Sequence, residues 1–399
     1  KLRKRFSLSE KQAQAILDLR LARLTKLEVF KLEEELKRLK ELIERLTAIV
    51  NSQRKQLEVV KEEILEIKRK YKTPRRSQLV FSEDEAEAER ADVKEPGVQS
   101  VACITADGRI KCVTERNFSA SNKSIGPNSK LSSVVIKDIR ILSDEQMLVV
   151  SDYGNCYRIY GEKVGCKFSD QGFRLAELHE DAAEDEKPVA LFRAEVGNGN
   201  LLFITEKGML KKTAWAEYAV GKSMFQGIRL NDGDKLLYVQ PDADEEGVTV
   251  FFVTQDGMCL NAKKDDIPVQ GRVSGGVKGI NLREGDRVVF ASQIDGEGEI
   301  VIATSESRFK RVIAAQIDPL PRYRKGVQIA SLKGAKVIFA NYVTVPYMLA
   351  VVTQDDTMTE LSTEEIPIDA TNTRGRTLKG VKWKAQEVYA MRYREAEES

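Results

Sequence analysis

A short motif recurs six times in this sequence at a spacing close to fifty residues. In each copy an apolar run ends in Thr or Ser and leads into a turn signal three residues later. The runs are Val101–Thr105, Met147–Ser151, Leu201–Thr205, Val250–Thr254, Ile300–Thr304 and Leu349–Thr353, and the turns centre on Gly108, Gly154, Gly208, Gly257, Ser307 and Asp356. Successive turns are 46, 54, 49, 50 and 49 residues apart. A repeat of this length predicts a propeller or a solenoid, whose small sheets bury their faces only against their neighbours.

Each repeat also contains further strand signals. A strand follows the turn, then comes a loop rich in Gly and basic residues, and a β-rich strand such as Asp286–Phe290 closes the unit. Four repeats have basic residues in the strand after the turn, at Arg109, Arg158, Lys211 with Lys212, and Lys310 with Arg311. Glycine suits hairpin turns of types I′ and II′, which need a positive φ, so Ser307 and Asp356 depart from the pattern. We expect about four strands per repeat.

Composition limits the classes of protein that remain. The chain has 399 residues and 42% hydrophobic content, which is enough for a large core and two or three domains. It has no apolar stretch of eighteen residues and nothing like a signal peptide at Lys1–Phe6, so we expect a soluble, intracellular protein without a membrane partner. Five cysteines without a C-x-x-C pair predict core thiols. His179 is the single histidine, which argues against a histidine metal centre or a Ser-His-Asp triad.

The first eighty residues have a different, helical pattern. Apolar residues alternate at spacings of four and three, with one polar break at Gln53, which is a heptad seam. The seam positions are Leu32, Leu36, Leu39, Ile43, Leu46, Val50, Leu57, Val60, Ile64, Ile67 and Tyr71. A single helix from about Leu27 to Tyr71 would be roughly 65 Å long. Its charged positions fit a solvated face better than a nucleic-acid contact.

Such a seam needs a partner, because an apolar stripe left in water costs about 25 cal/mol per Å². No second heptad run of comparable length occurs in the chain, so the partner helix is expected from another chain or from sequence preceding Lys1. Upstream, Ser7–Thr25 opens with a capping box at Ser7 or Ser9 and predicts one packed helix ending near Thr25. Its apolar residues are Ala13, Ile16, Leu17, Leu19, Leu21 and Leu24.

The block Leu8–Thr25, with the sequence LSEKQAQAILDLRLARLT, closely resembles the dimerisation-gate segment of the A subunit of bacterial type IIA topoisomerases, the family of DNA gyrase and topoisomerase IV. The heptad helix resembles the returning arm of that family's coiled coil, and the repeats resemble its C-terminal six-bladed β-pinwheel. The resemblance therefore implies a mainly β fold, a β-pinwheel preceded by a long coiled-coil helix and a short helical segment. The expected parts are a dimerisation gate at 1–26, a coiled-coil helix at 27–76, an acidic linker at 77–98 and a pinwheel at 99–399.

The same resemblance implies partners and a role. The partners would be double-stranded DNA, a second copy of the A subunit, plus the ATPase B subunit, in the cytoplasm at the nucleoid. Contact with the second copy would use Ile16, Leu17, Leu19, Leu21 and Leu24. The full enzyme would use Mg and ATP, whereas this chain would need no cofactor. The family's catalytic tyrosine lies before the segment that begins here, so no catalytic residue is expected and the chain should be inactive alone.

The pinwheel of the family bends DNA around a basic rim, to present it for ATP-dependent relaxation, decatenation or supercoiling. Residues 97–399, however, contain 40 Lys and Arg against 43 Asp and Glu, a net charge of −3, so binding requires segregated charge. Equivalent loops of a repeat lie along one edge and could form such a rim, although each cluster could equally be an ordinary solvated loop. The predicted DNA contacts are Lys123, Lys130, Lys222, Arg229, Arg272, Lys278, Arg322, Arg324, Lys325, Arg374, Arg376 and Lys379.

Two departures from the family pattern refine the expected role. Gyrase has a Gln-Arg-Arg-Gly-Gly-Lys-Gly box in the first blade, whereas the corresponding loop here, Ser119–Lys130, contains no arginine. A topoisomerase IV-like role therefore fits better than gyrase-type wrapping. The acidic tract Glu83–Pro96 is most simply a solvated linker, and a sharper hypothesis is that it competes with DNA for the rim. The competing class is a kelch or WD40-like propeller that binds proteins and no DNA.

Overall fold

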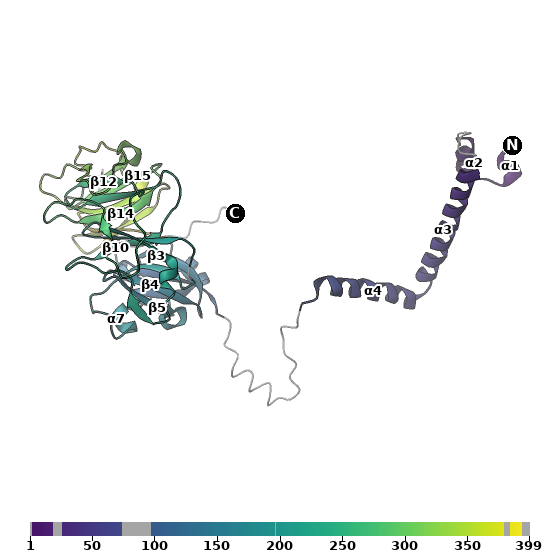
Figure 1. The fold of residues 1–399 in the computed structure, drawn as a ribbon, viewed down its shortest axis with the longest axis horizontal. Helices are drawn as coiled ribbons and strands as arrows, with labels where there is room; N and C mark the ends of the chain where they lie inside the picture. Colours follow the sequence, from purple (N-terminus) through teal and green to yellow (C-terminus); the bar gives the residue numbers. More distant parts are fainter. Residues whose placement is uncertain (1, 19–25, 74–96, 196, 379–383, 393–399) are drawn as a thin grey trace, which may run out of the picture. The chain divides into compact units, whose positions relative to one another are not determined.

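The structure is a computed structural model that describes residues 2–18, 26–73, 97–195, 197–378 and 384–392. The chain divides into two compact units, Lys1–Lys94 and Glu95–Ser399, which we call the helical unit and the ring unit (Figure 1). Among the described residues, no helix combines the length and the apolar character needed to cross a membrane.

The helical unit contains four helices in its described part. They are α1 (Leu2–Phe6), α2 (Glu10–Leu17), α3 (Lys26–Val50) and α4 (Gln53–Tyr71). The predicted capping box is at Ser9, whose hydroxyl accepts from the Gln12 amide while the Gln12 side chain accepts from the Ser9 amide. Helix α2 ends at Leu17 with Asp18 as its C-cap, before the predicted end near Thr25. Residues 19–25 lie outside the described part.

The heptad region forms two helices instead of the predicted single one. Helix α3 ends at Val50, and Ser52 is extended, with φ −135° and ψ 108°, before α4 begins. The Gln56 side chain donates to the Val50 carbonyl over 2.9 Å, which satisfies an acceptor at the end of α3. Asn51 and Ser52 interrupt the helix because their short polar side chains compete with the helical backbone for hydrogen bonds.

The heptad seam is exposed along both helices. The eleven seam residues named above are between 47% and 71% exposed, the extremes being Val60 and Val50. These values belong to the single chain, and no described residue of the helical unit covers the seam. The hydrophobic stripe thus has the pattern of a packed interface and lacks a second surface to pack on.

The ring unit consists of six antiparallel sheets in the described residues, one per sequence repeat. Their own strands are β1 (Gln99–Thr105), β2 (Ile110–Thr114) and β3 (Val135–Leu142); β4 (Gln146–Ser151), β5 (Asn155–Tyr160) and β6 (Pro188–Arg193); β7 (Asn200–Thr205), β8 (Met209–Ala214) and β10 (Leu236–Pro241); β11 (Thr249–Thr254), β12 (Met258–Ala262) and β14 (Val288–Ile294); β15 (Glu299–Thr304), β16 (Phe309–Ile313) and β18 (Val337–Val343); β19 (Met348–Thr353), β20 (Met358–Ser362) and β21 (Ala385–Ala390).

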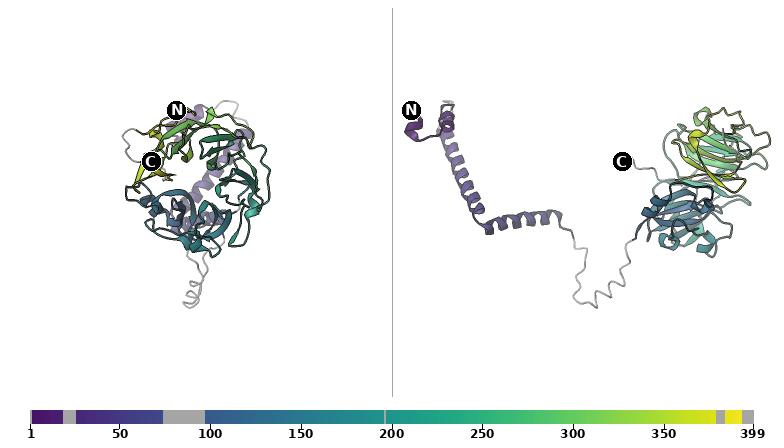
Figure 2. Two further views of the ribbon diagram at one scale, coloured as in Figure 1. Left: turned by 90° about the vertical axis from the view of Figure 1, so that its left-hand side faces the viewer. Right: turned by 180° about the vertical axis from the view of Figure 1, so that it is seen from behind.

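Short helices follow the second strand of most repeats. They are α6 (Glu115–Ser121), η2 (Leu131–Ser133), η3 (Gly161–Val164), α7 (Leu175–Leu178), η4 (Trp215–Tyr218), η5 (Ala314–Gln316) and η6 (Thr363–Glu365). The third strands of successive sheets contact one another, as β3 does β6 and β10 does β14, so these strands form the inner ring. Viewed along the ring axis, the sheets follow one another around a circle (Figure 2).

The Thr or Ser that ends each apolar run stabilises the turn after it. In all six repeats its hydroxyl accepts from the backbone amide four residues on, over 3.2 to 3.3 Å. Its carbonyl accepts from the residue at the turn centre, which has a positive φ even where it is Ser307 or Asp356 (57° each). Only that third loop residue has a positive φ. The turns are therefore three-residue loops ending in one left-handed residue, and the predicted types I′ and II′ are wrong.

The fourth strand of a sheet comes from the following repeat. Strand β9 (Met224–Gln226) pairs with β5, β13 (Val277–Lys278) with β8, and β17 (Val327–Gln328) with β12. In the first and fifth sheets the same exchange is reduced to bridges, Ile110 with Phe173 and Phe309 with Arg376. The basic, glycine-rich loop predicted within each repeat thus lies on the outer edge of the preceding sheet.

The sixth sheet closes the ring onto the first. The Met358 amide donates to the Pro127 carbonyl over 3.1 Å, and the Arg392 amide donates to Val135 over 2.9 Å. The Asn122 side chain donates to the Arg392 carbonyl. A buried apolar cluster joins the same two sheets, with Val134 of the first and Val352 of the sixth. Closure supplies every sheet with two neighbours.

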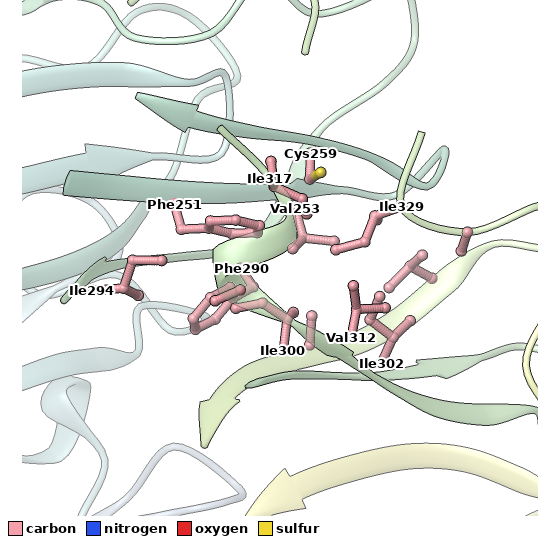
Figure 3. Close-up of a cluster of buried hydrophobic side chains, with 14 of the residues drawn as sticks. Phe251, Val253, Cys259, Phe290, Ile294, Ile300, Ile302, Val312, Ile317 and Ile329 are labelled. Carbon is pink, nitrogen blue, oxygen red and sulfur yellow. The ribbon is translucent and has the colours of Figure 1, made fainter. Parts of the chain in front are cut away.

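The core lies between adjacent sheets. One cluster joins Phe251 and Val253 of β11 to Ile300 and Ile302 of β15, with Ile329 of the exchanged segment at its edge (Figure 3). Every residue of β11 is buried, because neighbouring sheets cover both faces of its own sheet. This explains why the apolar runs in the sequence are continuous and do not alternate with polar residues.

The prediction of core thiols is confirmed for four of the five cysteines. Cys103, Cys112, Cys156 and Cys259 are buried, Cys166 is half-buried, and all five are free thiols. Burial raises the pKa of Cys103, Cys156 and Cys259 to about 12. These thiols therefore stay protonated and unreactive at neutral pH.

Candidate nucleic-acid interface

Five segments cross the outer edges of the sheets and form what we call the outer belt, residues 165–173, 222–229, 269–281, 320–331 and 368–376. Neighbouring segments are hydrogen-bonded to each other. The Arg229 amide donates to Ser274, the Asn281 amide to Arg324, and the Ser331 amide to Thr373, over 3.0 to 3.3 Å. The belt is thus continuous from the third repeat to the sixth.

Glycines bring the belt close to the strand beneath it. Gly276, Gly326 and Gly375 occupy equivalent positions with φ of 71° to 79°. A Cβ at these positions would lie 2.3, 1.9 and 3.0 Å from the carbonyl oxygens of Leu210, Cys259 and Phe309. Both the left-handed backbone and the close approach require glycine. The recurring glycine in the basic loops therefore serves the strand exchange.

Eight of the twelve predicted DNA contacts are exposed, namely Lys123, Lys130, Lys222, Arg229, Lys278, Arg324, Lys325 and Arg376. Six of them lie on four adjacent belt segments, and Lys222, Arg229, Lys278, Arg324 and Lys325 share the first three of these segments. Lys123 and Lys130 flank Pro127, where the loop of the first repeat meets the sixth sheet. The fold thus places the belt cations along the outer edge of the ring.

Four of the predicted contacts, including the exposed Arg376, are engaged with groups of the protein. The Arg272 guanidinium donates to the Gln226 carbonyl and lies 5.2 Å from the Phe225 ring. Arg322 donates to the Lys278 carbonyl over 3.1 Å. Arg374 pairs with Glu306 at 2.9 Å, and Arg376 pairs with Asp369 at 3.3 Å. Arg272 and Arg322 thus join neighbouring belt segments, and Arg374 ties the belt to the turn of the fifth repeat, so these three are less available to phosphate. Arg376 pairs within its own segment, and its side chain remains 64% exposed. Lys379 lies outside the described residues.

One exposed aromatic side chain lies among the belt cations. Tyr323 is 43% exposed and has a left-handed backbone with φ 60°. The Lys278 ammonium lies 5.1 Å from its ring centroid and 3.4 Å from its hydroxyl. This contact between two belt segments holds Lys278 beside Arg324 and Lys325 of the next segment.

The basic residues of the second strands are structural. Lys111, Lys211 and Lys310 are each 1% exposed, and their ammonium groups face backbone carbonyls. Arg158 and Arg311 donate to the carbonyls of Tyr218 and Ile366 in the following repeat. The recurrence of basic residues inside an otherwise apolar strand was the available sequence signal, but it does not separate a buried donor from an exposed contact.

Acidic residues gather on a different surface. We call the connection face the side formed by the links between sheets and by the segments that directly follow the second strands. Its accessible acidic residues are Glu115, Asp144, Glu145, Glu162, Glu195, Glu217, Asp244, Glu245, Glu246, Asp265, Asp266, Asp295, Glu297, Asp318, Glu364 and Glu365, and its accessible basic residues are Arg116, Lys163 and Lys263. The Asp242 side chain on the same face is buried and paired with Lys212 and Lys264. A net negative ring unit can therefore still present a positive edge.

The predicted dimerisation residues are only partly described. Ile16 is 44% exposed and Leu17 is 66% exposed on α2, whereas Ala13 is buried. Leu19, Leu21 and Leu24 lie outside the described part. In the single chain, the described pair is therefore free to contact another surface.

A closed ring of six sheets with exchanged outer strands is a β-pinwheel. The sequence model of the DNA gyrase C-terminal domain, described as a beta-propeller, matches residues 199–241 and 249–295. The crystal structure of the C-terminal domain of DNA topoisomerase IV covers 74% of this chain with a TM-score of 0.62 and 22% identity, over 93% of its own length. A DNA gyrase A C-terminal domain structure also covers 74%, over all of its own length, with a TM-score of 0.54 and 18% identity.

The relatives in sequence are topoisomerase A subunits. The A subunit of DNA gyrase from Campylobacter fetus is 30% identical over 81% of this chain and 42% of its own length. The A subunit of DNA topoisomerase 4 from Streptococcus pyogenes serotype M3 is 27% identical over 81% of this chain and 40% of its own length. The chain thus spans about two fifths of the curated relatives that it matches. The predicted resemblance to the C-terminal portion of the bacterial type IIA topoisomerase A subunit is confirmed.

Proposed function

We propose that the ring unit binds duplex DNA along the outer belt without sequence preference, and bends the duplex around the edge of the ring. The observation that carries this proposal is the continuity of the belt, which aligns Lys222, Arg229, Lys278, Arg324 and Lys325 on hydrogen-bonded neighbouring segments. Lysine and arginine on such an edge would meet phosphates and not base edges. The acidic connection face would repel the duplex and so confine it to the belt.

Salt-dependent binding of the full chain to a labelled duplex of about 40 base pairs tests the proposal. For a phosphate binder, the affinity should fall steeply between about 50 and 200 mM salt. The triple variant K278A/R324A/K325A should reduce the slope of log affinity against log salt by about 2.7, at roughly 0.9 per lost phosphate contact. The double variant R116A/K163A removes exposed cations of the connection face, away from the belt, and should leave the slope unchanged.

Equal losses for two unrelated duplex sequences would support backbone contacts, and a loss confined to one sequence would contradict them. A parent chain with no measurable DNA affinity at 50 mM salt would exclude the proposal, and would favour the protein-binding propeller predicted as the competing class.

We further infer that the chain acts as the C-terminal portion of a topoisomerase A subunit, together with a second A subunit plus the ATPase B subunit. There the ring unit would present the transported segment for relaxation or decatenation. The first-repeat loop Ser119–Lys130 supports this role over gyrase-type wrapping, because it contains no arginine. A topology assay on relaxed plasmid, with and without the ring unit in the assembled enzyme, would test this, and introduction of negative supercoils would contradict it.

A further inference from the structure

Three lysines occupy equivalent buried positions in alternate repeats. Lys111, Lys211 and Lys310 each follow the turn centre by three residues, in the first, third and fifth repeats. The second, fourth and sixth repeats have Tyr157, Leu260 and Thr359 at this position. A buried ammonium group must be satisfied by acceptors, so the partners of these lysines define their role.

The partners are backbone carbonyls of the outer belt. The Lys211 Nζ donates to the Gly227 carbonyl over 2.9 Å and to the Arg272 carbonyl. These two acceptors lie on adjacent belt segments, 222–229 and 269–281. One ammonium group therefore holds both segments that display Lys222, Arg229 and Lys278.

Lys310 holds the last belt segment, 368–376. Its Nζ donates to the carbonyls of Ala370, Thr371 and Thr373 over 2.9 to 3.2 Å. Burial lowers the pKa of Lys211 and Lys310 to about 8. At neutral pH both amines therefore still carry a charge and three protons to donate.

We propose that Lys211 and Lys310 are positioning residues for DNA, which hold from inside the ring the belt segments whose exposed cations meet phosphate. This inference rests on the proposed function of the belt. It makes DNA affinity depend on side chains that are 1% exposed and cannot themselves reach a duplex.

The chain supplies a matched control. Lys111 is equally buried, and its Nζ donates to the carbonyls of Ser132, at 2.6 Å, and Phe168, at 2.9 Å. Phe168 lies on the belt segment 165–173, which contains none of the predicted DNA contacts. Leu260 shows that an apolar side chain is compatible with this position of the fold.

The test compares Lys211→Met, Lys310→Met and Lys111→Met in the full chain. Methionine keeps the aliphatic stem and removes the ammonium group. Affinity for a labelled duplex is measured from 50 to 200 mM salt, and the urea midpoint reports the stability of each variant. We expect K211M to reduce the salt slope by about 0.9 and the affinity at 0.1 M salt roughly tenfold, the equivalent of one phosphate contact.

The other two variants should lose less DNA affinity than K211M. The affinity of K310M should fall about threefold, because Arg374 and Arg376 are already paired with acids. The affinity of K111M should stay within about twofold of that of the parent chain, and its urea midpoint should be similar. In a K222A/R229A/K278A background, K211M should lower the DNA affinity by no more than about a further twofold, because the cations that Lys211 positions have been removed.

The inference is overturned if K111M loses as much affinity as K211M, or if K211M keeps its full effect in the triple background. Either result would reduce the lysines to general stabilisers of the ring. Should K211M fail to fold, Lys211→Gln keeps a shorter hydrogen-bond donor at the site. The DNA affinities of Lys211→Gln and Lys111→Gln are then compared in the same way, and equal losses would overturn the inference. If the parent binds and the triple background binds equally well, the proposed function of the belt fails instead.

Discussion

The ring unit buries its apolar residues within one chain, whereas the helical unit leaves its apolar residues exposed. All six residues of β11 are buried, but Leu39 of the helical seam is 49% exposed and Ile43 is 63% exposed. Both segments are patterned for packing. The difference is that each sheet finds its two neighbours in the repeats before and after it, while the seam finds no second surface in the described part of its own unit. A repeat that closes on itself is self-sufficient, and a lone seam requires a partner.

The largest expected effect comes from removing core volume in the ring. Phe251 is fully buried between the fourth and fifth sheets. Replacing it by Ala should destabilise the ring unit by about 3 to 5 kcal/mol, because the sheets cannot collapse into the cavity. Urea unfolding followed by circular dichroism measures the change. Leu39→Ala is the matched variant in the helical unit, and a comparable loss of ring stability there would contradict the division into two units.

An effect of intermediate size is expected in self-association. The exposed seam should make the chain associate at micromolar concentration, because a partner helix would remove the stripe from water. The variant I43E/I64E places two charges in the seam and should weaken association about a hundredfold, or about 2.7 kcal/mol. Sedimentation velocity over a concentration series measures this. A parent chain that remains a monodisperse monomer would show that the seam is covered by the chain itself.

The smallest expected effect concerns a single turn of the ring. Asp356 is exposed and left-handed at the position where four other repeats have glycine. Asp356→Gly should stabilise the ring unit by about 0.5 to 1 kcal/mol, because glycine avoids the steric cost of a positive φ. Gly257→Ala is the reciprocal change and should destabilise it by at least as much. Thermal unfolding of both variants provides the measurement, and equal midpoints would contradict the assigned turn geometry.

The six repeats could be predicted from the sequence because their turns and strands depend on interactions between residues close together in the chain. The Thr or Ser at the end of each run is needed by the turn itself, where its hydroxyl satisfies the amide four residues on. Buried strands between two neighbours must be continuously apolar, which the six runs display. The core thiols follow from the same burial. These features lie within a few residues of each other in the sequence, so periodicity is sufficient to predict them.

The candidate interface was predicted only in part. The sequence indicated loops with basic residues, and eight of those side chains are exposed along one edge of the ring. It did not indicate that Arg272 and Arg322 are used to join belt segments, or that Lys211 is buried. The sequence does not distinguish a basic residue that donates to backbone carbonyls from one that is exposed to solvent. Which of the two it becomes depends on which loop crosses which strand in the fold.

Six sheets, their order and the positions of their turns follow from local sequence, because strand propensity, turn chemistry and hydroxyl capping act over short distances. Only the folded ring shows that outer strands are exchanged between repeats, each pairing with the sheet of the preceding repeat. Only the folded ring shows that the sixth sheet closes onto the first. These outcomes depend on which backbone groups and apolar surfaces find partners far away in the chain, and no local pattern records that choice.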